Sequence, residues 1–79
     1  MDKNIKIKTE YIKLSDLLKY ASIVSSGADA KYLVADGKVL VDGVICLQRG
    51  RKIYPGMRVS GFYDNSQFIL KVEGFAVTG

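Results

Sequence analysis

The chain has no histidine and a single cysteine among its 79 residues. General acid–base catalysis most often uses histidine, and catalytic zinc sites combine histidine and cysteine with carboxylates. The aspartates and glutamates form no pattern typical of a metal site or an acid/base pair, and no glycine-rich phosphate loop is present. We therefore expect a protein that is not an enzyme and that holds neither a metal ion nor a cofactor.

A lone cysteine cannot form an internal disulfide. Cys46 lies in the apolar run Val44-Ile45-Cys46-Leu47, so we predict a buried thiol and a reducing compartment. The first eight residues alternate isoleucine with lysine and contain no long apolar run, which argues against a signal peptide or a membrane span. These absences predict a cytoplasmic protein that does not bind membranes.

The composition is that of an ordinary globular protein, with 48% hydrophobic and 25% charged residues. A chain of this length has enough residues for one domain, so we expect residues 1–79 to form a single domain, and we favour a monomer. Lysine and arginine number 12 against 8 acidic residues, giving a net charge of +4. This excess favours a polyanionic partner but does not identify it.

Periodicity predicts a strand followed by two short helices. Residues 3–8 alternate apolar and polar side chains, which is typical of a strand buried on one face. From Leu14 the apolar residues fall at helical spacing, and Ser15 is a candidate cap for that helix. Ser26 followed by Asp29 resembles a capping box that opens a second helix, and Gly37 is placed to end it.

The second half of the sequence predicts strands. Asp42-Gly43 between two apolar runs, 38–41 and 44–47, is typical of a hairpin with a type I′ turn. Pro55-Gly56 marks another turn, and residues 58–63 and 67–73 are expected to form two strands joined through residues 64–66. We expect the three phenylalanines to lie in the core: Phe62, Phe68 and Phe75.

The segment from Gln48 to Arg58 has four basic residues and no acidic one. It has two interpretations of equal weight: a contact for a phosphate backbone, or a solvated loop. Lys19 and Lys31 on the helices have the same two interpretations, as phosphate contacts or as ordinary exposed lysines. The tyrosines best placed to stack on bases are Tyr20, Tyr32 and Tyr54.

The order of elements from Lys13 to Val59 resembles the RNA-binding domain first known from ribosomal protein S4, also called the alpha-L motif. The most specific part of the likeness is the block Gly37-Lys38-Val39-Leu40-Val41-Asp42-Gly43. The other residues that carry it are Lys13, Leu14, Leu18, Ser26, Ala30, Leu33, Val34, Ile53, Gly56 and Val59. The leading strand and the absence of an appended catalytic domain resemble the small stand-alone bacterial members of this family.

The resemblance implies an α+β fold in which two short helices pack on a small, mostly antiparallel sheet. The core motif would span residues 13–59, with flanking strands at 3–8 and 67–73. It also implies binding to structured RNA, with ribosomal RNA or ribosomal particles as the expected partner. The RNA-binding residues expected from the family's surface and the basic segment are Lys13, Lys19, Lys31, Arg49, Arg51, Lys52 and Arg58.

Four positions depart from the family pattern. The family usually has arginine where this chain has Gly27, aspartate at Ser15 and Met57, and asparagine at Asp42. The change at Gly27 removes an expected phosphate contact, so we hypothesise that Lys31 and the loop arginines contribute in its place.

Two other classes of function are open. A protein-interaction adaptor would use an exposed apolar surface or a free strand edge, and its binding would depend little on salt. A ubiquitin-like sulfur carrier would need a terminal Gly-Gly for activation, whereas the sequence ends Val77-Thr78-Gly79, which makes this the weaker alternative.

Overall fold

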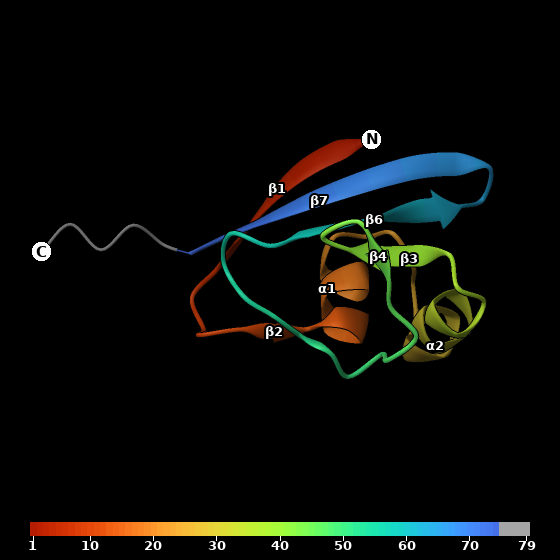
Figure 1. Cartoon of the computed structure of the whole chain (residues 1–79), viewed down its shortest axis with the longest axis horizontal. Coiled ribbons are helices and arrows are strands. Elements are labelled where there is room, and N and C mark those ends of the chain that lie inside the picture. The colour runs from red at the N-terminus through yellow and green to blue at the C-terminus, as the bar shows by residue number, and fades with distance from the viewer. Residues whose placement is uncertain (75–79) are drawn as a thin grey trace, which may run out of the picture.

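The computed structural model describes residues 1–74 and contains two helices and seven strands. In chain order these elements are β1 (Asp2–Ile7), β2 (Ile12–Lys13), α1 (Leu14–Tyr20), α2 (Gly27–Ala35), β3 (Val39–Val41), β4 (Val44–Ile45), β5 (Lys52–Ile53), β6 (Arg58–Tyr63) and β7 (Ser66–Gly74). Five strands form one sheet, and both helices lie on one side of it (Figure 1). This is the α+β arrangement that the sequence predicts.

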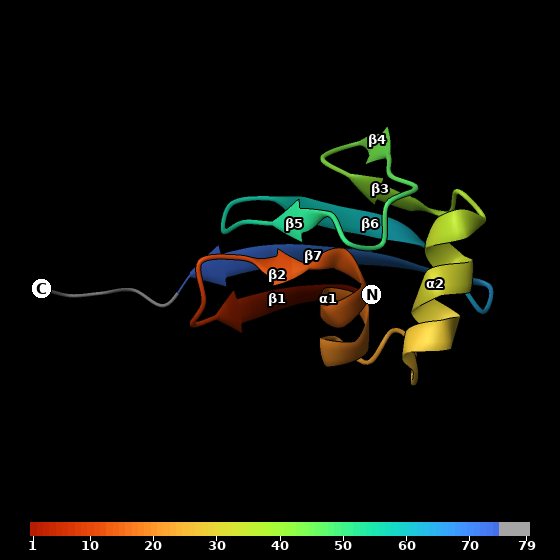
Figure 2. The same ribbon diagram turned by 90° about the horizontal axis from the view of Figure 1, so that it is seen from below.

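The strands of the large sheet follow the order β1-β7-β6-β3-β4. Neighbours pair antiparallel except β1 and β7, which run parallel, so the sheet is mostly antiparallel as expected. The short strands β2 and β5 form a separate antiparallel pair next to α1 (Figure 2). β5 is not predicted from the sequence, in which the whole basic segment has the composition of a loop.

The core lies between the helices and the face of the sheet that they cover. Alternating strand residues such as Ile5, Val59 and Leu70 point into it and meet Leu17 and Leu18 from α1. No polar or charged side chain is buried within residues 1–74, so burial of apolar surface is the main stabilising term. In this part of the chain, neither helix has the length and apolarity needed to cross a membrane.

The start of α1 differs from the prediction. Ser15 does not cap this helix: Lys13 occupies the N-cap position, and no side chain accepts a hydrogen bond there. The backbone amides of Leu14 and Ser15 instead donate to the carbonyl oxygens of Arg51 and Arg49, at 2.9 and 3.0 Å. A segment distant in sequence therefore satisfies two of the free amides at this helix end.

The boundaries of α2 follow the sequence signals. The backbone amide of Asp29 donates to the hydroxyl oxygen of Ser26 at 3.2 Å, which confirms Ser26 as the cap. The carboxylate of Asp29 accepts a hydrogen bond from the hydroxyl of Ser25 at 3.3 Å. At the other end Gly37 has a φ of 72°, the left-handed conformation expected of a residue that ends a helix.

The central hairpin has the predicted turn but a shorter second strand. Asp42 and Gly43 both have positive φ, at 50° and 84°, as a type I′ turn requires. β4 ends at Ile45, two residues before the end of the apolar run, because the chain leaves the sheet there. Cys46 is buried as expected, and its amide donates to the carbonyl of Val39 at 2.9 Å.

The prediction that the phenylalanines form part of the core is correct for one and wrong for another. Phe68 is buried, whereas the side chain of Phe62 is 59% exposed. Val59 and Gly61 face the core on β6, so the pleat turns Phe62 to the opposite side of the sheet. Phe75 lies outside the described residues.

Candidate nucleic-acid interface

Two lysines lie directly opposite each other on the small β2–β5 sheet. Lys13 pairs with Lys52, and Ile12 pairs with Ile53. Ile53 is fully buried, so the lysines occupy the outward face, where both are exposed. Like charges in directly opposite positions destabilise a strand pair, and neither lysine forms an ion pair within residues 1–74. Such a pair of cations is suited to an anionic partner.

The basic loop from Gln48 to Lys52 is fixed to the start of α1. The carbonyl oxygens of Arg49 and Arg51 accept the hydrogen bonds from the first amides of that helix, and both arginine side chains are exposed. The backbone of the loop is thus held in place while the two arginine side chains remain accessible to a ligand. This places both arginines next to Lys13, although the sequence separates them from it widely.

A second basic group lies where α1 ends and α2 begins. The ammonium of Lys19 pairs with the carboxylate of Asp16 at 3.4 Å and lies 4.0 Å from the position that a Cβ on Gly27 would take. Lys31 follows Gly27 by four residues, so it lies on the same side of α2. Lys19 and Lys31 therefore flank the position where the family usually has arginine, next to the positive end of the α2 dipole.

Six of the seven residues predicted to bind RNA belong to segments on the helix side of the large sheet (Figure 2). These residues, which we call the helix-side basic surface, are Lys13, Lys19, Lys31, Arg49, Arg51 and Lys52. α1 connects its two parts, and at 1.5 Å per residue about 9 Å separates Lys13 from Lys19 along the helix. Several phosphates of one folded RNA could be contacted over this span.

The structure separates Arg58 from the other six. Val59 points into the core, so the neighbouring Arg58 side chain lies on the sheet face that the helices leave open. There it is directly opposite Lys71 on β7, and both residues are exposed. Arg58 was grouped with the loop because it is close in sequence, but the turn at Pro55-Gly56 directs the chain into the large sheet before Arg58.

The aromatic residues near this surface include Tyr11, which is not predicted from the sequence. Tyr20 and Tyr32 are exposed on the helices, and Tyr54 is 40% exposed at the end of β5. The ring centroid of Tyr54 lies 5.7 Å from that of Tyr11, and the ammonium of Lys52 lies 4.9 Å from the centroid of Tyr11. Tyr11 comes two residues before Lys13, and residues two apart in a strand point to the same face. Recognising residues 11–13 as a strand would therefore have placed Tyr11 beside Lys13.

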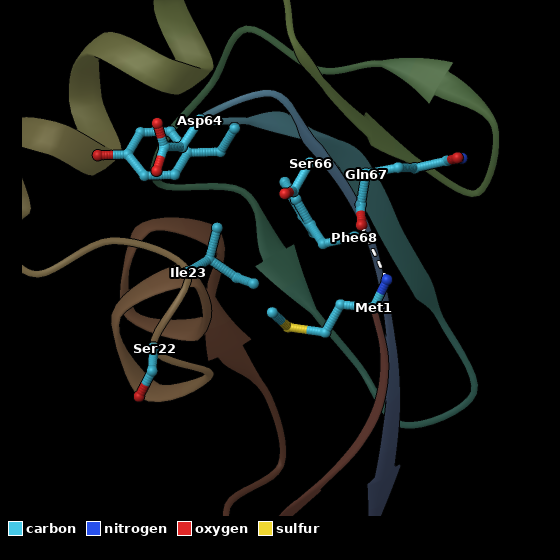
Figure 3. Close-up of a pocket in the computed structure, with 8 residues that line it drawn as sticks. Met1, Ser22, Ile23, Asp64, Ser66, Gln67 and Phe68 are labelled. Carbon is cyan, nitrogen blue, oxygen red and sulfur yellow. Dashed lines mark hydrogen bonds between the residues drawn. The ribbon is translucent and has the colours of Figure 1, made fainter.

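A hollow of about 190 Å³ lies away from this surface, between the α1–α2 connection and the turn that joins β6 to β7 (Figure 3). Ser22, Ile23 and Phe68 line it, and the terminal amino group of Met1 borders it while donating to the carbonyl of Gln67 at 2.9 Å. No lysine or arginine side chain is among the lining residues. The hollow is therefore separate from the lysine- and arginine-rich surface described above.

Comparison with known proteins identifies the family of this fold. The family model described as the S4 domain matches residues 5–71. A Bacillus subtilis protein named "Probable ribosome maturation protein RlbA" is 40% identical over 60 residues, which cover 73% of this chain and 84% of the relative. An Escherichia coli protein named "Putative RNA-binding protein YbcJ" is 42% identical over 53 residues, covering 67% and 76% of the two chains. The chain belongs to the S4 domain family.

Proposed function

We propose that this protein is a non-catalytic RNA-binding protein of the cytoplasm that binds structured ribosomal RNA in ribosomal particles. The observation that carries the proposal is the helix-side basic surface, which includes Lys13 directly opposite Lys52. Membership of the S4 domain family supports it. The names of the two relatives, one a ribosome maturation protein and the other an RNA-binding protein, also support it.

Binding would begin with electrostatic attraction to the phosphate backbone. A phosphate placed between Lys13 and Lys52 would neutralise two charges that repel each other in the free protein, so binding would relieve that repulsion. Arg49 and Arg51 add planar guanidinium groups that can bind phosphate oxygens in pairs. The loop backbone is already fixed on α1, so little backbone entropy is lost on binding.

The second group would hold another part of the same RNA. Lys19 and Lys31 lie beside the start of α2, where the helix dipole also favours an anion. Two phosphate-binding groups at a fixed separation select RNA by its backbone shape, as in a stem-loop or a junction. This mechanism does not require recognition of a base sequence.

The test compares two variants that lose equal charge. One changes Arg49, Arg51 and Lys52 to alanine; the other changes Lys6, Arg58 and Lys71, which are exposed on the open sheet face. Cosedimentation with ribosomal particles is measured across a salt series, and crosslinked RNA is sequenced. We expect the loop variant to lose at least tenfold in affinity and the slope of log affinity against log salt to fall by about 0.7–0.9 per lost phosphate contact.

The control variant has the same net charge, so it should remain close to wild type if the helix-side basic surface is the binding site. Equal losses in both variants would mean that net charge alone governs binding. A folded loop variant that binds like wild type would contradict the proposed site, and an absence of ribosomal RNA from the crosslinks would contradict the proposed partner.

A protein-interaction adaptor is the second candidate, and the edge strand β4 favours it. Val44, Ile45 and Leu47 are each at least 59% exposed, although all three are apolar. Exposed apolar side chains on an edge strand are typical of a surface that receives a protein partner. Recovery of a protein partner whose binding is insensitive to salt and is lost on Ile45→Asp, with no RNA recovered, would favour this candidate over the first.

A further inference from the structure

The outward face of the small β2–β5 sheet combines two lysines with two tyrosines. The register pairs Lys13 with Lys52, and continuing it by one residue places Tyr11 opposite Tyr54. The strand pleat puts all four side chains on the same face, because the isoleucine pair between them points into the core. The contact between the two tyrosine rings, at 5.7 Å between centroids, agrees with this placement.

The aromatic pair is held before any ligand binds. The ammonium of Lys52 lies 4.9 Å from the centroid of the Tyr11 ring, a cation–π contact that fixes both side chains. Tyr54 begins a tight turn in which the amide of Met57 donates to its carbonyl at 3.1 Å, and Gly56 has the positive φ of that turn. The rings are tilted by 48°, and Tyr54 keeps 40% of its surface exposed, so its ring is accessible.

We propose that Tyr54, supported by Tyr11, stacks on one unpaired nucleobase while Lys13 and Lys52 contact the phosphates next to it. This inference rests on the proposed RNA-binding function and adds a specific feature of the RNA. An exposed aromatic ring beside a pair of cations fits the two parts of a nucleotide, a flat base and an anionic phosphate. A base inside a paired helix has no free face, so the site selects an unpaired nucleotide.

The neighbouring acidic side chains agree with a base rather than a second phosphate. Glu10, Lys13 and Asp16 border a shallow hollow beside Tyr11, and the Asp16 carboxylate also pairs with Lys19. Carboxylates repel phosphate but accept hydrogen bonds from the amino groups on base edges. The hollow therefore offers the Glu10 carboxylate as an acceptor for a base edge, next to Lys13, which would hold the adjacent phosphate.

The experiment uses two RNA hairpins that differ in one feature. One has a fully paired stem, and the other has the same stem with a single bulged adenosine. Affinities of the full chain for both are measured at low salt, together with thermal unfolding of each variant to verify folding. We expect wild type to prefer the bulged hairpin, and Tyr54→Ala to lose roughly 5- to 150-fold in affinity for it, the usual effect of removing a stacking ring.

Three further variants separate stacking from other effects. Tyr54→Phe retains the ring and should bind the bulged RNA like wild type. Tyr11→Ala should reduce the preference for the bulge, because it removes the support for Tyr54 and Lys52. Phe62→Ala removes an exposed aromatic ring from the other side of the sheet and should change neither affinity.

The inference and the function on which it rests can fail separately. If wild type binds both hairpins equally and a folded Tyr54→Ala does the same, the stacking site is overturned while RNA binding stands. Equal losses for Tyr54→Phe and Tyr54→Ala would also overturn it, because the hydroxyl and not the ring would then be responsible. If wild type binds neither hairpin, both proposals fail.

Discussion

The ammonium group of Lys19 lies 4.0 Å from the point at which a side chain on Gly27 would begin. Apart from the chain neighbours of Gly27 and the backbone of its own helix, no other atom of the described residues comes within that distance, so Gly27 leaves open space at the first residue of α2. The arginine that the family usually has at this position would project into the same space. Lys19 thus supplies a cation from α1 near the position that has lost one on α2.

Gly27→Arg should therefore increase RNA affinity. The new guanidinium would add a phosphate contact beside Lys19 and Lys31, giving a gain of roughly three- to tenfold after the repulsion among the three cations. The salt slope should become steeper by about 0.7–0.9 for one added contact. Gly27→Gln is the control, since it adds a comparable side chain without charge. Equal affinities for the two variants would contradict this role for the position.

Lys13→Glu should increase the stability of the fold and decrease its affinity for RNA. It replaces a repulsive cross-strand pair with an attractive one opposite Lys52, which is worth about 0.2–1 kcal/mol in a strand pair. The Tm of this 79-residue chain should then rise by about 1–8 °C, because 1 kcal/mol shifts Tm by about 4–8 °C at this size. RNA affinity should fall at the same time. A lower Tm together with unchanged binding would refute the interpretation of this lysine pair.

Gly61→Ala should destabilise the fold strongly. A Cβ at this position would collide with the backbone carbonyl oxygen of Lys38 and would lie 3.0 Å from the Phe68 ring. Backbone cannot move aside as a flexible side chain can, so we expect a loss of about 1–3 kcal/mol or more in urea unfolding. Gly50→Ala is the matched control, because no atom lies within 4 Å of its Cβ position and its φ lies outside the left-handed region.

Asp42→Ala should destabilise the central hairpin without affecting RNA binding. The Asp42 carboxylate accepts a hydrogen bond from the backbone amide of Arg58 at 2.9 Å, and the residue has a φ of 50°. Alanine loses a bond worth about 1 kcal/mol and adopts left-handed backbone less readily by about 1–2 kcal/mol. Asp42→Asn keeps an acceptor and the same backbone preference, so urea unfolding should place it near wild type. Equal stabilities for the two variants would contradict this explanation.

Local signals predicted much of the fold. The cap at Ser26, the end of α2 at Gly37 and the turn at Asp42-Gly43 each depend on a few adjacent residues, and the structure confirms all three. The boundaries of β6 also match the prediction, because its apolar residues lie between two clear turns. Caps, turns and strand boundaries that depend on neighbouring residues could therefore be predicted from the sequence alone.

Features that join distant segments could not be predicted in the same way. A two-residue strand such as β5 has no periodicity to detect, and it exists because Ile53 is buried beside Ile12. Carbonyl groups from the loop satisfy the start of α1, and no side-chain pattern encodes such contacts. The same holds for the candidate site. The structure places Tyr11 next to Lys13 and Lys52 and places Arg58 on the other face of the large sheet, because strand pairing and pleat decide which side chains share a face.

The parallel pairing of β1 with β7 also affects the order of folding. The first strand lies at the edge of the large sheet and pairs there with β7 alone, from Asp2 opposite Ile69 to Ile7 opposite Gly74. During synthesis β1 has no partner until almost all of the described chain has been translated. Contacts between such distant segments form slowly, whereas the helices and the central hairpin depend on nearby residues. We therefore expect the pairing of β1 with β7 to form after the helices and the central hairpin.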